Sequence, residues 1–228
     1  MCTTDLTIET ATWKGALSSG TNEVLQYHIS YPVVTSTRFR RESRRINRYY
    51  RQKARAFERY LRRKQYPLAV KSCQYAQKHG YPFLPFEANT AFTITYNECC
   101  SLSLYLDQYL YTGGAHGMTT RSSDTWDLPR GRLTGLDVYL ADQAYARTAV
   151  QRQIKAQIEN GNPMDYFDNY QDNIRQSFRK QQFYLTDAGV MLYFQQYDLA
   201  PYSSGIPVFL LAYDGDLVRE PVCDYGKA

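Results

Sequence analysis

The 228-residue sequence has few of the residues and patterns from which common enzyme centres are built. Its three histidines form no HExxH or HxH pattern, and no acidic cluster has metal-ligand spacing, so no metal site is predicted. GxSxG, GxxxxGKS/T and GxGxxG motifs are missing, which argues against a nucleophile elbow and a phosphate-binding loop. We therefore expect no cofactor, and the sequence favours a non-catalytic role.

Long apolar runs are also missing. No segment approaches the roughly 18 to 20 consecutive apolar residues of a membrane-spanning helix. The first residues, Met1–Asp5, have neither the basic nor the apolar region of a secretion signal. We therefore expect no membrane span, and the missing signal taken alone predicts a cytoplasmic location.

Cysteine is scarce and irregularly spaced. The five cysteines contain no CxxC pair, and their odd number does not predict a disulfide framework. Cys99 and Cys100 fall in an alternating run, where adjacent side chains point to opposite faces of a strand. We expect reduced, partly buried thiols at Cys2, Cys73, Cys99, Cys100 and Cys223.

Tyrosine, in contrast, is abundant, with 22 residues, and its ring suits the half-buried surface of a sheet. Alternation predicts strands at 6–13, 23–34, 87–96, 99–111, 118–128, 183–186, 190–197 and 208–213. Helical periodicity predicts helices at 38–64, 68–78, 144–160 and 165–177.

This order of elements contains no repeated βαβ unit. It predicts an α+β fold with antiparallel sheets. The N-terminal half has one long amphipathic helix, and the second half has two helices and a C-terminal meander. We expect two α+β regions, 1–128 and 129–228, which can pack as one compact unit.

The net charge of +5 is unevenly spread. Between Ser36 and Lys64 it reaches +11, which leaves −6 for the rest of the sequence. One stripe of this segment is apolar and the other faces are rich in arginine, and Pro67 is expected to interrupt the helix. The apolar stripe consists of Phe39, Ile46, Tyr50, Phe57 and Leu61.

Two interpretations of the Arg38–Lys64 helix remain open. In the first, the stripe packs on a sheet while the arginines are solvated or pair with the acidic remainder. In the second, the basic face binds a polyanion. Nucleic acid is not favoured, because aromatic residues that could stack on bases lie on the apolar stripe. The candidate polyanion-binding residues are Arg41, Arg44, Arg45, Arg48 and Arg55.

The glycine-rich loop 112–117 contains His116, the one histidine without an easy place in a strand or at a helix end. Serine and aspartate follow at 122–124, so a Ser/His/Asp arrangement can be assembled on paper. This gives an alternative function, a hydrolase that acts on a glycan or peptide. The favoured interpretation is that His116 fixes its loop by hydrogen bonds to backbone groups.

A second unusual loop follows at 198–207, with two prolines, a glycine and small hydroxyl residues. Tyr197 and Tyr202 lie in or beside it. A rigid loop of this kind can present tyrosines to a protein partner or a glycan, or it can be a crossover between strands.

Four segments of the sequence resemble the RsiV-like family. They are 111–117 (YTGGAHG), 133–137 (LTGLD), 183–189 (FYLTDAG) and 200–207 (APYSSGIP). The first half is similar only in layout, with a long helix that carries Arg45-Ile46-Asn47. The family includes the extracellular domain of lysozyme-sensing anti-sigma factors and resembles the region preceding the catalytic domain of the peptidoglycan deacetylase PdaC.

The resemblance implies a non-catalytic bacterial binding or sensing module that recognises a protein, such as lysozyme, or a cell-wall glycan. It also implies an extracytoplasmic location, against the cytoplasmic one that the missing signal predicts. The family's sigma-binding segment, membrane helix and metal-dependent deacetylase domain have no counterpart here, so those activities do not carry over. The expected ligand-binding residues are Gly113, Gly114, His116, Gly117, Tyr197, Pro201, Tyr202 and Gly205.

Overall fold

The computed structural model describes residues 5–142, 146–213 and 216–223. The chain divides into two compact units, each described by itself. The first, here the helix–sheet unit, comprises residues 6–92 and 106–120. The second, the C-terminal unit, comprises residues 93–105 and the described residues from 121 onward, with Asp5. The boundary expected after residue 128 stays a prediction.

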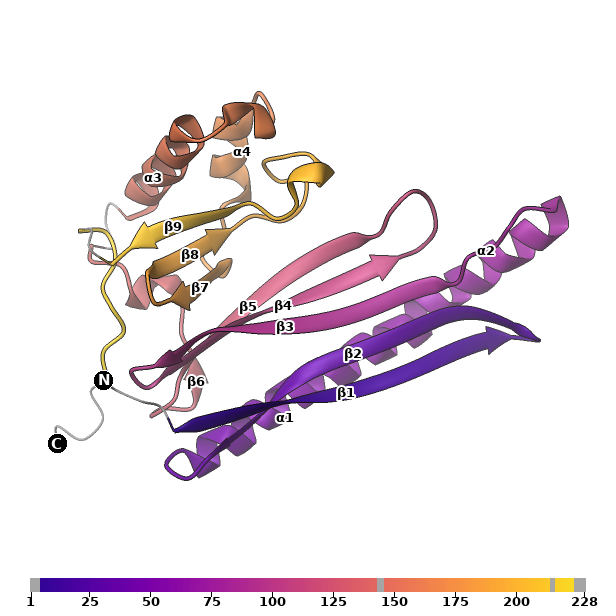
Figure 1. Cartoon of the computed structure of the whole chain (residues 1–228), viewed down its shortest axis with the longest axis horizontal. Coiled ribbons are helices and arrows are strands. Elements are labelled where there is room, and N and C mark those ends of the chain that lie inside the picture. Colours follow the sequence, from indigo (N-terminus) through magenta and orange to yellow (C-terminus); the bar gives the residue numbers. More distant parts are fainter. Residues whose placement is uncertain (1–4, 143–145, 214–215, 224–228) are drawn as a thin grey trace. The chain divides into compact units, whose positions relative to one another are not determined.

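The predicted α+β fold is confirmed (Figure 1). One sheet has six strands in the order β1-β2-β3-β4-β5-β6, and a second has three in the order β7-β8-β9. Strands β3, β4 and β5 contribute residues to both units. The six-stranded sheet consists of β1 (Leu6–Ser19), β2 (Asn22–Ser36), β3 (Phe86–Glu98), β4 (Ser101–Tyr111), β5 (Met118–Asp127) and β6 (Arg132–Leu133).

Strand pairing follows the lengths of the connections. β1 and β2 form an antiparallel hairpin, and β5–β6 is antiparallel as well. In contrast, β2 and β3 are parallel, in the register Leu25↔Phe86 to Ile29↔Thr90. A parallel pair needs a long crossover, and the long helix between these strands supplies it. The expected antiparallel pairing therefore does not hold for this one pair.

The long helix comprises α1 (Arg40–Tyr60), a π-helical turn η1 (Leu61–Gln65) and α2 (Tyr66–His79). The interruption predicted at Pro67 is wrong, because the chain stays helical through it. Proline lacks the N–H of an ordinary helical hydrogen bond, and a π-turn placed just before it lets the helix continue. α2 ends at Gly80, whose φ of 68° is a left-handed C-terminal cap, as the sequence predicted.

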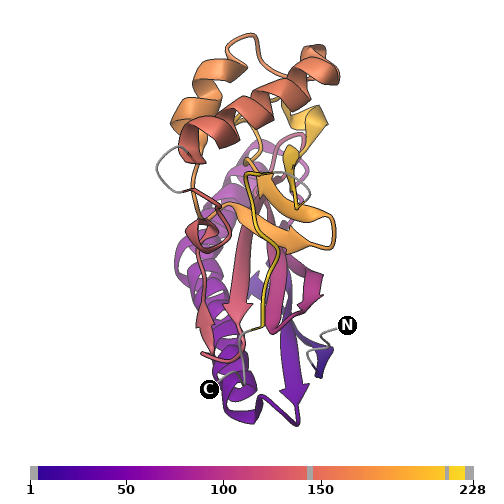
Figure 2. The same cartoon turned by 90° about the vertical axis from the view of Figure 1, so that its left-hand side faces the viewer.

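The predicted apolar stripe of α1 is confirmed and packs on β2 (Figures 1 and 2). Ile46, Tyr50 and Leu61 are fully buried, as are Leu25 and Ile29 of β2. Burial of side chains of this size stabilises a fold by about 1.5–3 kcal/mol each. The packing of this stripe holds the whole length of α1 on the sheet.

Two polar contacts fix α1 against β2. The Asn47 side-chain amide accepts from the Val34 N–H at 2.7 Å and donates to the Val34 carbonyl at 2.9 Å. At the other end, the Tyr27 hydroxyl donates to Glu58 Oε1 at 2.9 Å, and Arg62 donates to both residues. Burial raises the pKa of Tyr27, and the hydrogen bond from Tyr27 lowers the pKa of Glu58.

The turn between β3 and β4 corrects the prediction for two cysteines. Cys99 and Cys100 are not in a strand but form the turn itself, with φ of 44° and 57°. A two-residue hairpin turn of type I′ has positive φ at both positions, which glycine or asparagine usually occupies. Cys100 is bonded to Cys223 in a disulfide, so the prediction of reduced thiols is wrong for this pair. Cys73 and Cys99 are free, and Cys2 lies outside the described residues.

The C-terminal unit packs two helices against its three-stranded sheet (Figure 2). Its fully buried residues include Leu136, Ile154 and Phe194. The part of helix 144–160 expected at Ala144 lies outside the described residues, and the helix expected from Asp165 begins only at Tyr170. The elements are η2 (Leu136–Val138), α3 (Ala146–Asn160), η3 (Pro163–Asp165), α4 (Tyr170–Ser177), β7 (Phe183–Thr186), β8 (Gly189–Tyr193), η4 (Tyr202–Ser204) and β9 (Val208–Ala212).

No helix in the described part of the chain has both the length and the apolarity needed to cross a membrane.

Candidate functional site

The glycine-rich loop joins β4 to β5 in the helix–sheet unit. Gly113 and Gly114 have φ of 97° and 88°. Residues with a side chain rarely adopt such values, so the loop needs glycine here. The Tyr111 hydroxyl donates to the Gly114 carbonyl at 3.1 Å. Gly117 is buried under the Tyr109 ring, where an added Cβ would lie 2.5 Å from the ring. The predicted ligand-binding residues Gly113, Gly114, His116 and Gly117 therefore lie in one turn with a constrained backbone.

His116 is exposed at the end of this turn. Its Nδ1 lies 3.1 Å from the Gly117 carbonyl oxygen. This contact agrees with the interpretation that the imidazole orients the loop backbone. The hydrolase alternative, which needs serine and aspartate from 122–124, stays a prediction. Those residues belong to the C-terminal unit, and His116 belongs to the helix–sheet unit.

The second predicted loop connects β8 to β9 and contains Tyr197, Pro201, Tyr202 and Gly205. Tyr197 is 46% exposed and has a φ of 66°, which is uncommon for a residue with a side chain. The Tyr202 ring lies 6.2 Å from the Tyr197 ring, between centroids. Gly205 also has positive φ, at 68°. We call residues 195–207 the aromatic loop.

Side chains at the base of the aromatic loop hold its backbone in place. The Gln195 amide accepts from the Arg121 N–H at 2.9 Å and donates to the Arg121 carbonyl at 2.7 Å. Asp198 accepts from the Gln195 N–H at 2.9 Å, and burial raises the pKa of this carboxyl despite that hydrogen bond. Ser204 donates to the Asp165 carbonyl at 2.9 Å.

An aromatic cluster lies beside the strand residue that Gln195 binds. The Arg121 guanidinium lies 3.7 Å from the centroid of the Tyr105 ring, a cation–π contact. Tyr105 lies 5.2 Å from Tyr184, and Tyr184 lies 6.2 Å from Tyr193, between ring centroids. The aromatic loop is therefore attached, through Gln195, to a part of the C-terminal unit in which aromatic rings pack together.

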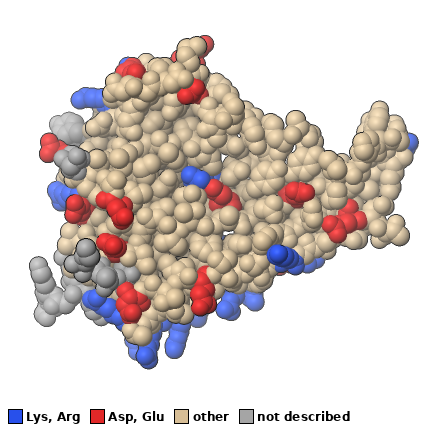
Figure 3. Space-filling model, in the orientation of Figure 1, with Lys and Arg blue, Asp and Glu red and all other residues tan. Residues whose placement is uncertain are grey.

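The five candidate polyanion-binding arginines lie on α1 and are all exposed. Figure 3 shows Lys and Arg side chains along the lower border of the view, where Figure 1 places α1. In the helix–sheet unit, Arg62 forms an ion pair with Glu58 at 3.0 Å. In the part of the chain that the structure describes, no acidic side chain forms an ion pair with Arg41, Arg44, Arg45 or Arg48.

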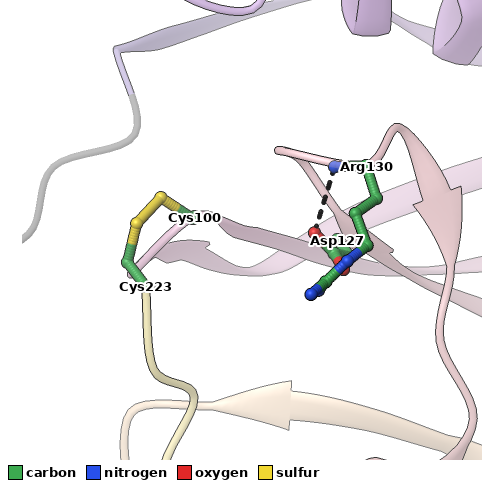
Figure 4. The surroundings of a disulfide bond; sticks show 4 residues. All are labelled: Cys100, Asp127, Arg130 and Cys223. Carbon is green, nitrogen blue, oxygen red and sulfur yellow. Dashed lines mark hydrogen bonds and ion pairs between the residues drawn. A yellow bond between two sulfur atoms is a disulfide. The ribbon is translucent and has the colours of Figure 1, made fainter. Parts of the chain in front are cut away.

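A polar hollow of about 570 Å³ lies beside the Cys100–Cys223 disulfide (Figure 4). The Asp127 carboxylate binds the Arg130 guanidinium at 2.6 Å and also accepts from the Arg130 N–H at 3.2 Å. Burial raises the pKa of the Tyr139 hydroxyl, which lines the same hollow. Charges of both signs line it, so it has no clear preference for an anion or a cation. Within the described residues, no group of three His, Cys, Asp or Glu side chains could hold a metal ion.

Sequence reasoning missed the residues that fix the loops and the disulfide. Gln195 and Arg121 are 74 residues apart, and Cys100 and Cys223 are 123 apart. Neither pair has a local pattern, because each contact depends on two distant segments meeting in the fold. For the disulfide, the sequence offers one signal, which is that Cys223 follows the last predicted strand.

Two family models match successive parts of the sequence. Residues 18–119 match the family model described as deacetylase PdaC. Residues 138–214 match the model of the protein family of unknown function DUF3298. No curated protein matches the sequence.

Two crystal structures of DUF3298 family members share the fold. The protein from Bacteroides fragilis has a TM-score of 0.70 and 17% identity, over 97% of this chain and 96% of its own. The protein from Pseudomonas aeruginosa PAO1 has a TM-score of 0.63 and 18% identity, over 95% of each chain. The two family models support the resemblance to the RsiV/PdaC-like family drawn from the sequence, and the two structures show the same fold: a region similar to PdaC is followed by a region similar to DUF3298.

Proposed function

We propose that this chain is a non-catalytic binding module that recognises a protein or a cell-envelope glycan through its aromatic loop. The observation that carries the proposal is the conformation of Tyr197. Its positive φ is maintained in a loop pinned by Gln195 and Asp198, while nearly half of the residue is exposed. Strained residues that the surrounding structure holds in place occur often at binding sites.

The chemistry of the loop suits recognition. Two tyrosines offer flat, rigid surfaces that can stack on a sugar or pack into a protein interface, and each also has a hydroxyl for a hydrogen bond. Because the loop is already fixed, binding requires little further ordering of its backbone. Lysozyme and peptidoglycan are the probes that the family resemblance suggests. A disulfide agrees with an oxidising, extracytoplasmic location, where both would be met.

The test measures binding of the purified chain to hen egg-white lysozyme by calorimetry and to insoluble peptidoglycan by sedimentation. We expect saturable binding to one of the two probes. The double variant Tyr197→Ala/Tyr202→Ala should weaken it by about tenfold or more, as expected for aromatic anchor residues.

Tyr81→Ala is the matched control, because Tyr81 is 61% exposed but belongs to the helix–sheet unit. It should leave the affinity unchanged, and circular dichroism should show both variants folded. Absence of saturable binding to both probes, or an equal loss in the Tyr81→Ala control, would overturn the proposal.

A further inference from the structure

The outer face of α1 carries a continuous row of arginines. Arg44, Arg48, Arg51 and Arg55 follow one another at steps of four, three and four residues, which places them on one face of a helix. Arg41 and Arg59 extend the row to a length of about 27 Å at 1.5 Å per residue. This face is opposite the apolar stripe that packs on β2.

Two shallow hollows follow this row and meet at Gln52 and Arg55. Their polar lining includes arginine guanidinium groups, the Gln52 amide and the Lys53 ammonium, which are hydrogen-bond donors suited to phosphate oxygens. The first hollow is lined by Arg44, Asn47, Arg48, Arg51, Gln52 and Arg55. The second is lined by Tyr49, Gln52, Lys53, Arg55, Ala56 and Arg59.

The positive charge of the row is not neutralised within α1. No acidic residue occurs between Glu42 and Glu58. Glu58 is committed to Tyr27 and Arg62. Among the described residues, no ion pair involves Arg41, Arg44, Arg48 or Arg51. Like charges three and four residues apart destabilise a helix, so the fold alone gives no reason for this row.

We infer that this arginine row binds a linear phosphodiester polymer of the cell envelope by charge, without reading the order of its monomers. Successive arginines are about 4.5 to 6 Å apart along the helix axis, a step that suits a chain with one negative charge per repeat. A small anion would need converging donors rather than an extended row. The disulfide favours an envelope polymer over a nucleic acid, because disulfides persist in oxidising compartments.

The structure argues against a membrane surface as the occupant. A helix that binds a bilayer inserts its apolar face between the lipids. The apolar face of α1 is instead covered by the sheet, with Ile46, Tyr50 and Leu61 fully buried. On the exposed side of α1, Tyr49 lines one hollow and Tyr60 is 42% exposed, so arginine side chains outnumber apolar ones there.

The test measures binding of the full chain to purified poly(glycerol phosphate) at about 50 and about 200 mM salt. Four phosphate contacts should give an affinity loss of about 50-fold over this range. The variant Arg44→Gln/Arg48→Gln/Arg51→Gln/Arg55→Gln should abolish most of the binding and its salt dependence. Removing the repulsion should leave its thermal stability equal or higher.

Two further variants separate specific contacts from net charge. Lys14→Gln/Lys71→Gln/Lys78→Gln/Arg132→Gln removes the same charge from exposed positions elsewhere and should retain most of the affinity. Replacement of the four row arginines by lysine should keep the salt dependence but weaken binding, because lysine lacks the bidentate fork.

Several results would overturn the inference. They are equal loss in the two glutamine variants, absence of binding at low salt, tighter binding to a dT20 oligonucleotide, and binding confined to phosphatidylglycerol vesicles. The inference does not rest on the proposed function. Its residues lie in the helix–sheet unit, so loss of polymer binding leaves the aromatic-loop experiment unaffected.

Discussion

In both units, a side-chain amide binds the backbone N–H and carbonyl of one other residue, but the sequence separation of the two residues differs. In the helix–sheet unit, the Asn47 amide binds both backbone groups of Val34, which is 13 residues away. In the C-terminal unit, the Gln195 amide binds both backbone groups of Arg121 across 74 residues, and Gln157 binds Leu210 across 53. The short pin supports a helix that is also held by its apolar stripe. The long-range contacts fix the aromatic loop to β5 and α3 to β9.

This comparison indicates where each unit is vulnerable. The helix–sheet unit depends on apolar packing of a long helix, and polar contacts add to it. The C-terminal unit also depends on contacts between distant segments, including the disulfide. Removing a long-range contact should therefore lower the free energy of unfolding more than removing a short-range one. It should also increase hydrogen exchange mainly in the segments that the contact joins.

The largest effect should follow removal of the disulfide. Cys100→Ser/Cys223→Ser should lower the free energy of unfolding by about 4–5 kcal/mol, because the bond closes a loop of more than a hundred residues in the unfolded chain. Urea denaturation measures the loss, and hydrogen exchange should show it mainly in the C-terminal unit. Cys99→Ser is the control that keeps the bond. Unchanged stability of wild-type protein under reducing conditions would contradict the prediction.

A smaller loss of stability should follow removal of either side-chain amide, that of Gln195 or that of Asn47. Gln195→Ala removes two hydrogen bonds and should lower stability by about 2 kcal/mol. It should also increase hydrogen exchange throughout the aromatic loop. Asn47→Ala removes an equivalent pair, but exchange in α1 should change little, because Ile46 and Tyr50 remain buried. If each variant increased hydrogen exchange equally in its own segment, the proposed difference between the two units would be contradicted.

The smallest effect concerns the charged contact between α1 and β2. Because the pKa of Glu58 is lowered in the folded state, its contribution is present above its ordinary value of 4.5. That contribution is lost as the pH falls through the lower folded-state value. Glu58→Gln should lower stability at pH 7 by about 1 kcal/mol and progressively less in acid. Glu9→Gln, an exposed control, should leave the stability at pH 7 unchanged; a pH-independent effect of Glu58→Gln would be inconsistent with this role.

Much of the fold follows from periodicity and turn chemistry. The stripe of Ile46, Tyr50 and Leu61 predicts the packed face of α1, and Gly80 predicts the end of α2. The break expected at Pro67 fails because local rules assume an α-helix, whereas a π-turn absorbs the missing hydrogen bond. Cys99 and Cys100 fail as strand residues because a turn with two positive φ values lacks its usual glycine or asparagine.

The candidate sites also include features that the local sequence shows and features that only the fold shows. Sequence alone identifies the glycine turn around His116, the aromatic loop with Tyr197 and Tyr202, and the row of arginines, because each is a contiguous or periodic pattern. It could not show that Gln195 pins the aromatic loop to Arg121, since nothing in either segment specifies the other.

The sequence by itself determined the α+β class, the long amphipathic helix, the family resemblance and the uneven charge. These properties are local, because they depend on side-chain period, on glycine and proline, and on charge density along the chain. Only the tertiary structure decided the parallel pairing of β2 with β3, the bond between Cys100 and Cys223, and the hydrogen bonds between Gln195 and Arg121. Those properties depend on segments that are distant in sequence and meet only when the apolar surfaces of the units are buried.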